Sequence, residues 1–485
     1  MHLNEIVNRC NIISISGPIN PDIKSIVFDS RKAGLGTVFV AIKGTQVDGH
    51  QYINQVIDKG CLCLVVEEEV NVPSNVTVVK VENTSECLGF MASEFYANPS
   101  SHLKLVGITG TNGKTTTATL LHQVFTDLGY KVGLLSTVVN KIGQEEVPST
   151  HTTPDPVSLN ALLSDMVNQG CEFCFMEVSS HSVVQHRITG LSFTGGVFTN
   201  ITHDHLDYHG SFKEYIKAKK GFFDALPIGA FALTNVDDKN GNIMLQNTLA
   251  HKYGYALKTP TDFKAKIIEN QFSGLVLNVD GNELWTKLIG AFNAYNLLAI
   301  YGVGILLGQD KIEILTVLSN LESVVGRFQQ IRSTSGITAI VDYAHTPDAL
   351  ENVLQTISSI RTKNECVLTV VGCGGDRDKA KRPKMAAVAC ELSDKVIITS
   401  DNPRSEEPEQ IINEMMEGVE GHFFNKTISI TDREQAIKTA CIMAQPGDII
   451  LIAGKGHENY QEIKGIKHPF DDLKIVTNLF EKLDK

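Results

Sequence analysis

The stretch that most constrains the fold is an apolar strand that runs through a glycine-rich loop into a helix. LKLVGI at 103–108 leads into TGTNGKTTT, and the following ATLLHQVFTDLG has a helical periodicity that ends at a glycine. Gly110 and Gly113 let backbone N–H groups approach an anion at the N-terminus of that helix. The chain is therefore predicted to contain an α/β domain that binds a nucleotide through its phosphates.

The spacing within this loop narrows the class of nucleotide-binding protein. Lys114 would supply the charge and Thr115 a magnesium ligand, but only two residues separate Gly110 from Gly113, where the common phosphate loop has four before its Gly-Lys pair. This spacing disfavours the common GTPase and motor families. GCGG at 372–375 resembles a dinucleotide fingerprint, but Arg377 is not the third glycine that this motif requires, so NAD binding is not expected.

Length and strand pattern predict three domains. A chain of 485 residues exceeds what one hydrophobic core usually organises. We expect a small N-terminal α/β domain (1–98), a central P-loop-type domain with a mostly parallel sheet (99–327) and a C-terminal Rossmann-like domain (328–485). From about Gly336, each apolar strand runs into a polar or glycine-rich loop. Ligands bind beyond the carboxyl ends of such strands, so the last domain is predicted to be a binding domain.

Composition excludes several classes of protein. The net charge of -12, from 43 Lys plus Arg against 55 Asp plus Glu, argues against a general nucleic-acid or anionic-membrane binder. The sequence has neither a membrane-length apolar run nor the basic-then-apolar order of a signal peptide, which predicts a cytoplasmic protein without membrane insertion, and we expect a monomer. Two cysteine pairs lie in strand-like runs and are predicted to be buried, reduced thiols: Cys61 with Cys63, and Cys171 with Cys174.

A lysine falls on the apolar face of a predicted helix. Ser211 and Glu214 read as a capping box, so a helix is expected to begin there. Lys219 lies in the middle of its apolar stripe, and the solvent side carries Lys213, Lys217 and Lys220. The apolar stripe consists of Phe212, Tyr215, Ile216, Phe222 and Phe223. A buried ammonium must reach water, find a carboxylate or lose its charge, so Lys219 is a candidate functional residue.

Imidazoles and carboxylates cluster just before this helix. The run HDHLDYH at 203–209 precedes it, and Glu177 ends the predicted strand in MEVSSHS. Magnesium takes few protein ligands and completes its shell with phosphate oxygens and water. We therefore hypothesise a divalent metal held by Glu177 and His205.

The ordered motifs of this chain resemble the Mur ligases of cell-wall synthesis over nearly its whole length. The shared segments are TGTNGKTTT, MEVSSH, TNITHDHLDYHG, GAFNAYN, VVGRF and VDYAHTPDAL. Further segments resemble the branch that adds the third amino acid to UDP-N-acetylmuramoyl-L-alanyl-D-glutamate: FDSR, KGTQVDGH, HTTPD, GCGGDRDKAKRP, DNPRSEEP and GKGHE. The resemblance implies an ATP-dependent amide ligase of peptidoglycan synthesis that uses Mg²⁺ and forms an acyl phosphate.

The resemblance also implies roles for individual residues. Glu177 and His205 would hold a second magnesium, and Lys219 matches a lysine that is carbamylated in this family. The implied ATP-binding residues are Gly110, Thr111, Asn112, Gly113, Lys114, Thr115, Thr116, Asn293, Asn296, Arg327 and Asp342, of which Asn293 and Asn296 match the family's adenine contacts. Those implied for the nucleotide-sugar dipeptide are Ser30, Thr152, Thr153, Ser179, Gln185 and Arg187. His151 stands where many relatives have Asn, which is a departure from the pattern.

The incoming amine is the main question of specificity. In the family pattern, the residues that bind and select the amine are Asp401, Asn402, Pro403 and Arg404, together with Arg377, Gly454 and Glu458. Relatives that add meso-diaminopimelate carry this D-N-P-R sequence, whereas those that add L-lysine lack the arginine. The chemistry agrees, because the planar fork of arginine can bind the distal carboxylate of diaminopimelate bidentately.

Three alternatives stay open at this point. One is L-lysine as the amine, and another is folylpolyglutamate synthesis, which would leave the FDSR domain and DNPRSEEP unexplained. The third is a catalytically silent nucleotide-sugar binding protein. The join near Gly326 and Arg327 is a hypothesised hinge that controls domain closure.

Overall fold

The fold described here is that of a computed structural model, which describes residues 1–18, 20–44, 47–149, 151–202, 204 and 206–485. The chain divides into two compact units. The first unit consists of Met1–Gly110, Thr117–Asn200 and Lys213–Tyr255. The second consists of Thr111–Thr116, Ile201–Phe212 and Ala256–Lys485. The three domain boundaries given above stay predictions.

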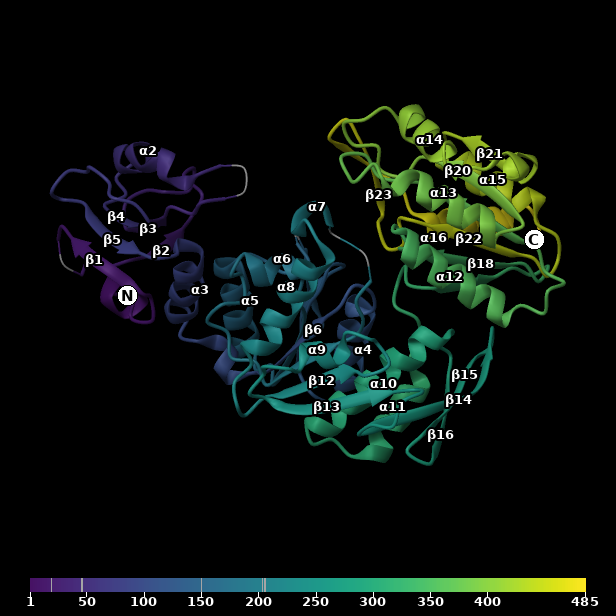
Figure 1. The fold of residues 1–485 in the computed structure, drawn as a ribbon, viewed down its shortest axis with the longest axis horizontal. Coiled ribbons are helices and arrows are strands. Elements are labelled where there is room, and N and C mark those ends of the chain that lie inside the picture. Colours follow the sequence, from purple (N-terminus) through teal and green to yellow (C-terminus); the bar gives the residue numbers. More distant parts are fainter. Residues whose placement is uncertain (19, 45–46, 150, 203, 205) are drawn as a thin grey trace. The chain divides into compact units, whose positions relative to one another are not determined.

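The first unit begins with a five-stranded sheet in the order β1-β5-β4-β3-β2 (Figure 1). Its strands are β1 (Ile12–Ser16), β2 (Ser25–Val27), β3 (Thr37–Val40), β4 (Cys63–Val66) and β5 (Thr77–Val81). The accompanying helices are α1 (Leu3–Ile6), η1 (Gly49–Tyr52), α2 (Ile53–Asp58) and α3 (Thr84–Phe95). The exposed β1 is antiparallel to β5, and the remaining neighbours in the sheet are parallel.

The larger sheet of the first unit is mostly parallel, as predicted. Within this unit the strand order is β13-β12-β11-β6-β10-β7-β8-β9, in which only the short β8 and β9 are antiparallel. The parallel strands are β6 (Lys104–Thr109), β7 (Val132–Leu135), β10 (Phe173–Glu177), β11 (Gly195–Phe198), β12 (Phe231–Asn235) and β13 (His251–Ala256). The other two strands are β8 (Asn140–Ile142) and β9 (Glu145–Val147). The associated helices are η2 (Pro99–His102), α4 (Lys114–Asp127), α5 (Pro156–Asn168), α6 (Ser180–Val184), α8 (Phe212–Asp224) and α9 (Gly241–Met244).

The second unit contains an antiparallel meander that the sequence did not predict. It consists of β14 (Phe263–Gln271), β15 (Gly274–Val279) and β16 (Asn282–Thr286). The helices α10 (Ala291–Leu306) and α11 (Lys311–Asn320) follow, and α10 packs against β14. The short α7 (Leu206–His209) also belongs to this unit.

The C-terminal sheet has the order β17-β18-β22-β19-β20-β21, and only β17 is antiparallel. Its strands are β17 (Gln329–Arg332), β18 (Thr338–Asp342), β19 (Val367–Val371), β20 (Lys395–Thr399), β21 (Thr427–Ile430) and β22 (Ile449–Ala453). One apolar core joins one face of the sheet to α12 (Pro347–Ile360), α13 (Lys381–Leu392) and α14 (Pro408–Met416). A second core joins the other face to α15 (Arg433–Met443) and α16 (Asp472–Lys482) (Figure 1). The remaining elements are η3 (Gly421–Lys426) and the hairpin of β23 (Tyr460–Ile463) and β24 (Ile466–Pro469).

This doubly wound arrangement brings the carboxyl ends of β18, β22, β19 and β20 to one edge of the sheet. The loops singled out in the sequence analysis all leave from that edge, which is where open α/β sheets bind ligands. In the described part of the chain, no helix is long and apolar enough to cross a membrane.

The cysteines follow the prediction with one addition. Cys61, Cys63, Cys171 and Cys174 are free and buried, which confirms that interpretation of both pairs. Burial raises the pKa of the Cys63 thiol to about 12, so this thiol is protonated at neutral pH. A disulfide between Cys10 and Cys87 was not predicted, because the two residues lie 77 positions apart in the sequence.

Candidate functional site

The phosphate loop has the predicted geometry between β6 and α4. The strand ends at Thr109 and the helix begins at Lys114, so the loop leads directly into a helix N-terminus, a position that favours an anion. Gly110 has φ 154° and Gly113 φ 87°, a region of backbone space that side chains disfavour. A Cβ at Gly110 would lie 1.9 Å from Thr199 Oγ1, so only glycine fits there. Lys114 Nζ donates to the Thr111 carbonyl at 2.8 Å, within the loop that it is predicted to serve.

Several of the predicted nucleotide contacts lie together in the second unit. Arg327 Nη2 donates to Thr115 Oγ1 at 3.3 Å, and its guanidinium lies 4.6 Å from the centre of the Tyr343 ring. Asp342 ends β18 and accepts from the backbone N–H of Phe328 at 2.6 Å, while burial raises the pKa of its carboxyl. The structure thus brings a cation and a carboxylate to the join that precedes the C-terminal sheet.

The two asparagines predicted to contact adenine lie in the first two turns of α10. Both side chains are buried, and Asn296 Nδ2 donates to Asn293 Oδ1 at 3.1 Å. Asn293 Nδ2 donates in turn to the Ile289 carbonyl at 2.8 Å, which fixes the orientation of its amide. Their role in binding adenine stays a prediction.

Lys219 lies where the helical-face argument placed it. In α8 the Lys219 side chain is 1% exposed, next to buried Tyr215 and Phe222, whereas Lys213 and Lys217 are exposed. Lys220 is only half-buried and pairs with Asp224 at 2.6 Å. Lys219 Nζ donates to the Gly110 carbonyl at 2.7 Å and lies 4.7 Å from the centre of the Tyr215 ring. The misplaced cation therefore contacts the first glycine of the phosphate loop.

Glu177 ends β10 with an oxygen that needs a partner. The side chain is fully buried, and its Oε1 accepts from the backbone N–H of Thr137 at 2.7 Å. Its Oε2 has no hydrogen-bond partner among the residues that the structure describes. A buried carboxylate oxygen without a donor is costly unless a cation completes it, so Glu177 fits the predicted metal ligand.

The rest of the predicted metal set is only partly visible. His205 lies outside the described residues. Within those residues, no three His, Cys, Asp or Glu side chains gather as a metal cluster. Thr115 is 5% exposed in the phosphate loop. A magnesium ion with few protein ligands, completed by phosphate oxygens and water, is compatible with this donor set.

The residues predicted to bind the nucleotide-sugar dipeptide converge beyond β10. Arg187 Nη1 donates to the Thr153 carbonyl at 2.8 Å, and its Nε donates to Gln185 Oε1 at 3.0 Å. The backbone N–H of Ser179 donates to Thr153 Oγ1 at 3.3 Å, and Thr137 Oγ1 donates to Thr152 Oγ1 at 3.1 Å.

Ser30, the predicted uridine contact, lies apart from that cluster, after β2. Its carbonyl accepts from Lys59 Nζ at 2.8 Å. His151 is exposed, and its carbonyl accepts from Ser149 Oγ at 3.2 Å.

The residues predicted to bind the amine meet at the carboxyl edge of the C-terminal sheet. Asn402 follows β20, and its Nδ2 donates to Glu458 Oε2 at 2.7 Å. Gly454 follows β22 with φ 118°, and a Cβ there would lie 2.5 Å from Asp401 Oδ2. Burial and the neighbouring Asp401 raise the pKa of Glu458.

Sequence reasoning missed Lys455 at this site. Its side chain is fully buried, and its Nζ donates to Asn402 Oδ1 at 3.1 Å and to Glu458 Oε2 at 3.3 Å. It also lies 3.8 Å from Asp401 Oδ1. The sequence feature that could have identified it is a lysine directly after the apolar strand IILIAG, within the motif GKGHE.

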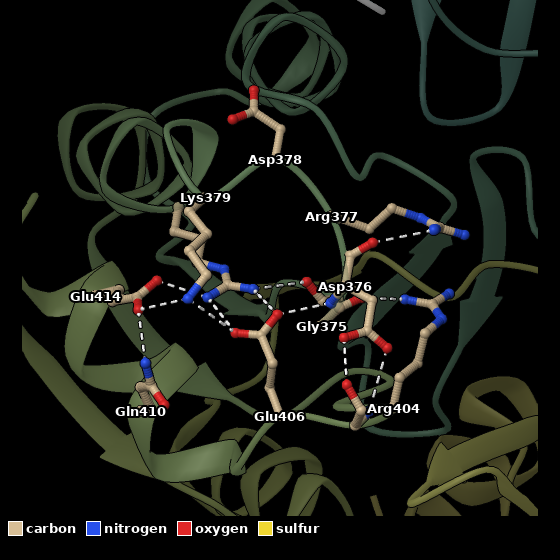
Figure 2. A network of polar contacts seen from close by, with 12 residues as sticks. Gly375, Asp376, Arg377, Asp378, Lys379, Arg404, Glu406, Gln410 and Glu414 are labelled. Carbon is tan, nitrogen blue, oxygen red and sulfur yellow. Dashed lines mark hydrogen bonds and ion pairs between the residues drawn. The ribbon is translucent and has the colours of Figure 1, made fainter. Parts of the chain in front are cut away.

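Arg404 belongs to the loop after β20, and its side chain reaches the loop after β19 (Figure 2). It has φ 53°, and its Nη1 donates to the Gly375 carbonyl at 2.8 Å. Its Nε lies 3.6 Å from Glu462 Oε2. The side chain of Arg377 is directed differently, and its Nη1 donates to the Asp376 carbonyl at 3.2 Å. Contacts with Gly375 and Glu462 thus hold the Arg404 side chain at the carboxyl edge of the sheet.

Together, the phosphate loop and the loops at the edge of the C-terminal sheet define a three-domain α/β ligase that uses ATP. The chain belongs to the Mur ligase family. Three family models match it: the Mur ligase family catalytic domain at 22–96, the Mur ligase middle domain at 108–304 and the Mur ligase glutamate ligase domain at 326–456. The predicted fold class and enzyme class are confirmed.

Relatives similar to this chain share one name, UDP-N-acetylmuramoyl-L-alanyl-D-glutamate--2,6-diaminopimelate ligase. The protein from Cytophaga hutchinsonii is 56% identical over 487 residues, covering 100% of both chains. That from Phocaeicola vulgatus is 54% identical over 484 residues, covering 99% of each. A solved structure of a ligase of the same name has a TM-score of 0.71 at 31% identity and covers 100% of this chain and 99% of its own.

Proposed function

We propose that this chain is the ligase that adds meso-2,6-diaminopimelate to UDP-N-acetylmuramoyl-L-alanyl-D-glutamate, which gives the tripeptide precursor of peptidoglycan. The observation that carries the proposal is Arg404 in the D-N-P-R sequence, at the carboxyl edge of the C-terminal sheet. Full-length relatives that carry this name support the same amine. Use of ATP agrees with a place of action in the cytoplasm.

The reaction begins by converting a poor leaving group into phosphate. The γ-phosphoryl group of ATP passes to the γ-carboxylate of the D-glutamate residue, which gives an acyl phosphate and ADP. Lys114 and the backbone N–H groups at the start of α4 neutralise the charge that develops on the phosphoryl oxygens. Thr115, Glu177 and His205 would hold Mg²⁺, which would supply Lewis-acid stabilisation of the same charge.

The second step is attack by the amine of diaminopimelate on the acyl carbonyl. The tetrahedral intermediate expels inorganic phosphate, and loss of a proton from nitrogen leaves the amide. Arg404 binds the distal carboxylate of the amino acid, and Glu458 and Asp401 face its ammonium. The phosphate loop and the amine site lie in different family domains, so turnover requires these domains to close together about the join at Gly326.

A carbamylated Lys219 completes the proposal. The burial of its side chain, 1% exposed, and its position at Gly110 support a modification that exchanges a costly cation for a carboxylate. The carbamate would then supply a further anionic ligand for the metal.

The test of this function is phosphate release from ATP in the presence of the nucleotide-sugar dipeptide, with one amine added at a time. Release with meso-diaminopimelate and little with L-lysine is the expected result. Release with L-lysine alone would identify the other branch of the family. Release with neither amine, despite binding of the nucleotide sugar, would identify a binding protein that has lost catalysis.

Arg404→Ala should raise the KM for diaminopimelate about 10- to 100-fold, because a charge-assisted bidentate contact contributes about 1.5 to 3 kcal/mol. The KM values for ATP and for the nucleotide sugar should stay near those of the wild type in steady-state assays. Arg332→Ala, at an exposed arginine of the same domain, is the matched control. An equal loss of activity with diaminopimelate and L-lysine would contradict this role.

Glu177→Ala should raise the magnesium concentration needed for half-maximal turnover at least about 10-fold, since it removes a metal-binding carboxylate. Titration of turnover with MgCl₂ measures this directly. The control is Glu172→Ala, at an exposed carboxylate just before the same strand. An unchanged magnesium dependence in Glu177→Ala would remove the predicted metal site.

A further inference from the structure

A fully buried arginine beside the amine site holds two loops together. Arg382 lies in the first turn of α13, and its side chain is 0% exposed. Its Nη1 and Nη2 donate to the two carboxylate oxygens of Glu406 at 2.9 and 2.8 Å, a bidentate pair. Nη1 also donates to Glu414 Oε2, and Nη2 donates to the Gly374 carbonyl at 3.3 Å. Arg382 therefore contacts both the loop at 372–378 and the loop at 401–406.

Glu406 carries this contact onward to the backbone of the first loop. Its Oε1 accepts from the backbone N–H of Asp376 at 2.6 Å. The Asp376 carboxylate accepts in turn from the backbone N–H of Ser405 at 3.2 Å and from its hydroxyl. The side chains of two loops, which leave from neighbouring strands, thus bind each other's backbone in both directions.

The same two loops position Arg404. The backbone N–H of Gly375 donates to the Asn402 carbonyl at 2.9 Å, and the Gly375 carbonyl accepts from Arg404 Nη1. The fit leaves no room for side chains, because a Cβ at Gly375 would lie 1.9 Å from the Pro403 carbonyl oxygen. A Cβ at Gly374 would lie 2.7 Å from Arg404 Nη1. A shift of either loop would therefore move the guanidinium of Arg404.

Electrostatics makes Arg382 the centre of the network. Its hydrogen bonds hold the pKa of Glu406 at about 2, so this carboxylate stays ionised at every physiological pH. Without Arg382, Glu406 and Glu414 would face each other with Lys379, 57% exposed, as the shared cation at 3.5 Å from each. Two carboxylates that share a solvated lysine repel each other and lose the bidentate geometry.

We propose that Arg382 is a positioning residue for amine specificity: through Glu406 it fixes the register of the two loops and so places Arg404 for the distal carboxylate of the amine. The inference rests on the proposed function. It assigns Arg382 no contact with substrate, and the effect travels through Glu406, Asp376 and Gly375. A displacement of about 1 Å in such a contact can cost about 100-fold in rate, so the effect should be large enough to measure.

The test uses two conservative variants of the full-length enzyme. Arg382→Lys keeps the charge but loses the bidentate fork, and Glu406→Gln keeps the shape but loses the charge. Each should raise the KM for diaminopimelate about 10- to 100-fold. The KM values for ATP and for the nucleotide sugar should stay within about twofold. The preference for diaminopimelate over L-lysine should fall in the same variants, because a displaced Arg404 no longer binds the distal carboxylate that only diaminopimelate carries.

A matched control lies at the opposite ends of the same strands. Arg361 Nη1 contacts Asp394 Oδ2 at 2.6 Å, and Asp394 accepts from the backbone N–H of Val367 at 2.8 Å, just as Glu406 accepts from Asp376. Arg361→Lys should leave all KM values unchanged. An unchanged KM for diaminopimelate in both test variants would overturn the inference, as would equal rises for all three substrates. A wild-type enzyme that uses only L-lysine would instead overturn the proposed function. The wild-type assay with each amine therefore distinguishes that failure from a failure of the inference about Arg382.

Discussion

Replacing Lys219 with alanine should lower turnover about 1,000-fold while leaving the chain folded. The side chain is buried against Tyr215 and donates to the Gly110 carbonyl, so the variant removes a cation that contacts the first glycine of the phosphate loop. Loss of a single preorganised electrostatic contact to a developing charge costs about 100- to 1,000-fold, and a carbamate that helps to hold the metal lies at the upper end. Phosphate release with diaminopimelate measures the change.

Lys217 provides a matched control on the same helix. Its side chain is 76% exposed and forms only a surface pair with Glu214, so Lys217→Ala should retain wild-type turnover. Supplying ¹³C-bicarbonate to the wild type should give a carbamate carbon signal by NMR that Lys219→Ala lacks. Full turnover in Lys219→Ala would remove both the carbamate and the catalytic role.

Lys114→Ala should lower turnover by about 1,000-fold or more. Lys114 is the only cation that the phosphate loop itself provides, and cations that neutralise a transferring phosphoryl group contribute about 10³- to 10⁵-fold. The reaction should fail at the first step, so single-turnover experiments should show no acyl phosphate trapped by hydroxylamine. Lys104→Ala, at the exposed start of β6, is the control. Normal accumulation of acyl phosphate in Lys114→Ala would contradict a role for this lysine in phosphoryl transfer.

Strands and helices with strong local patterns could be predicted from the sequence. The apolar runs that end in polar loops gave β18, β19, β20 and β22 within a few residues, because buried parallel strands are apolar throughout. The face of α8 was predictable for a similar reason, since the position of Lys219 depends only on helical periodicity.

Features that depend on a distant partner could not be predicted. The strand β14 was missed for a different, local reason: Lys264 and Lys266 alternate with buried residues only at its start, and the rest of the strand is largely polar. Arg382 lies in the basic run KAKRP, and its burial could not be predicted, because its partners Glu406 and Glu414 lie 24 and 32 residues further along the chain. Lys455 was missed for the same reason, since Asn402 lies 53 residues away.

The tight contact between the loops at 372–378 and 401–406 also constrains how such an enzyme can change in evolution. Gly375 leaves no room for a side chain beside Pro403, and Arg382, in the first turn of α13, binds Glu406 of the second loop. The effect of a substitution in one loop therefore depends on the residues of the other. A variant that replaced Arg404 alone would keep two loops whose contacts are arranged around the Arg404 guanidinium. We therefore expect a change of amine preference in this chain to require substitutions in both loops, and a chimaera that exchanges only one loop to lose the preference of both parents.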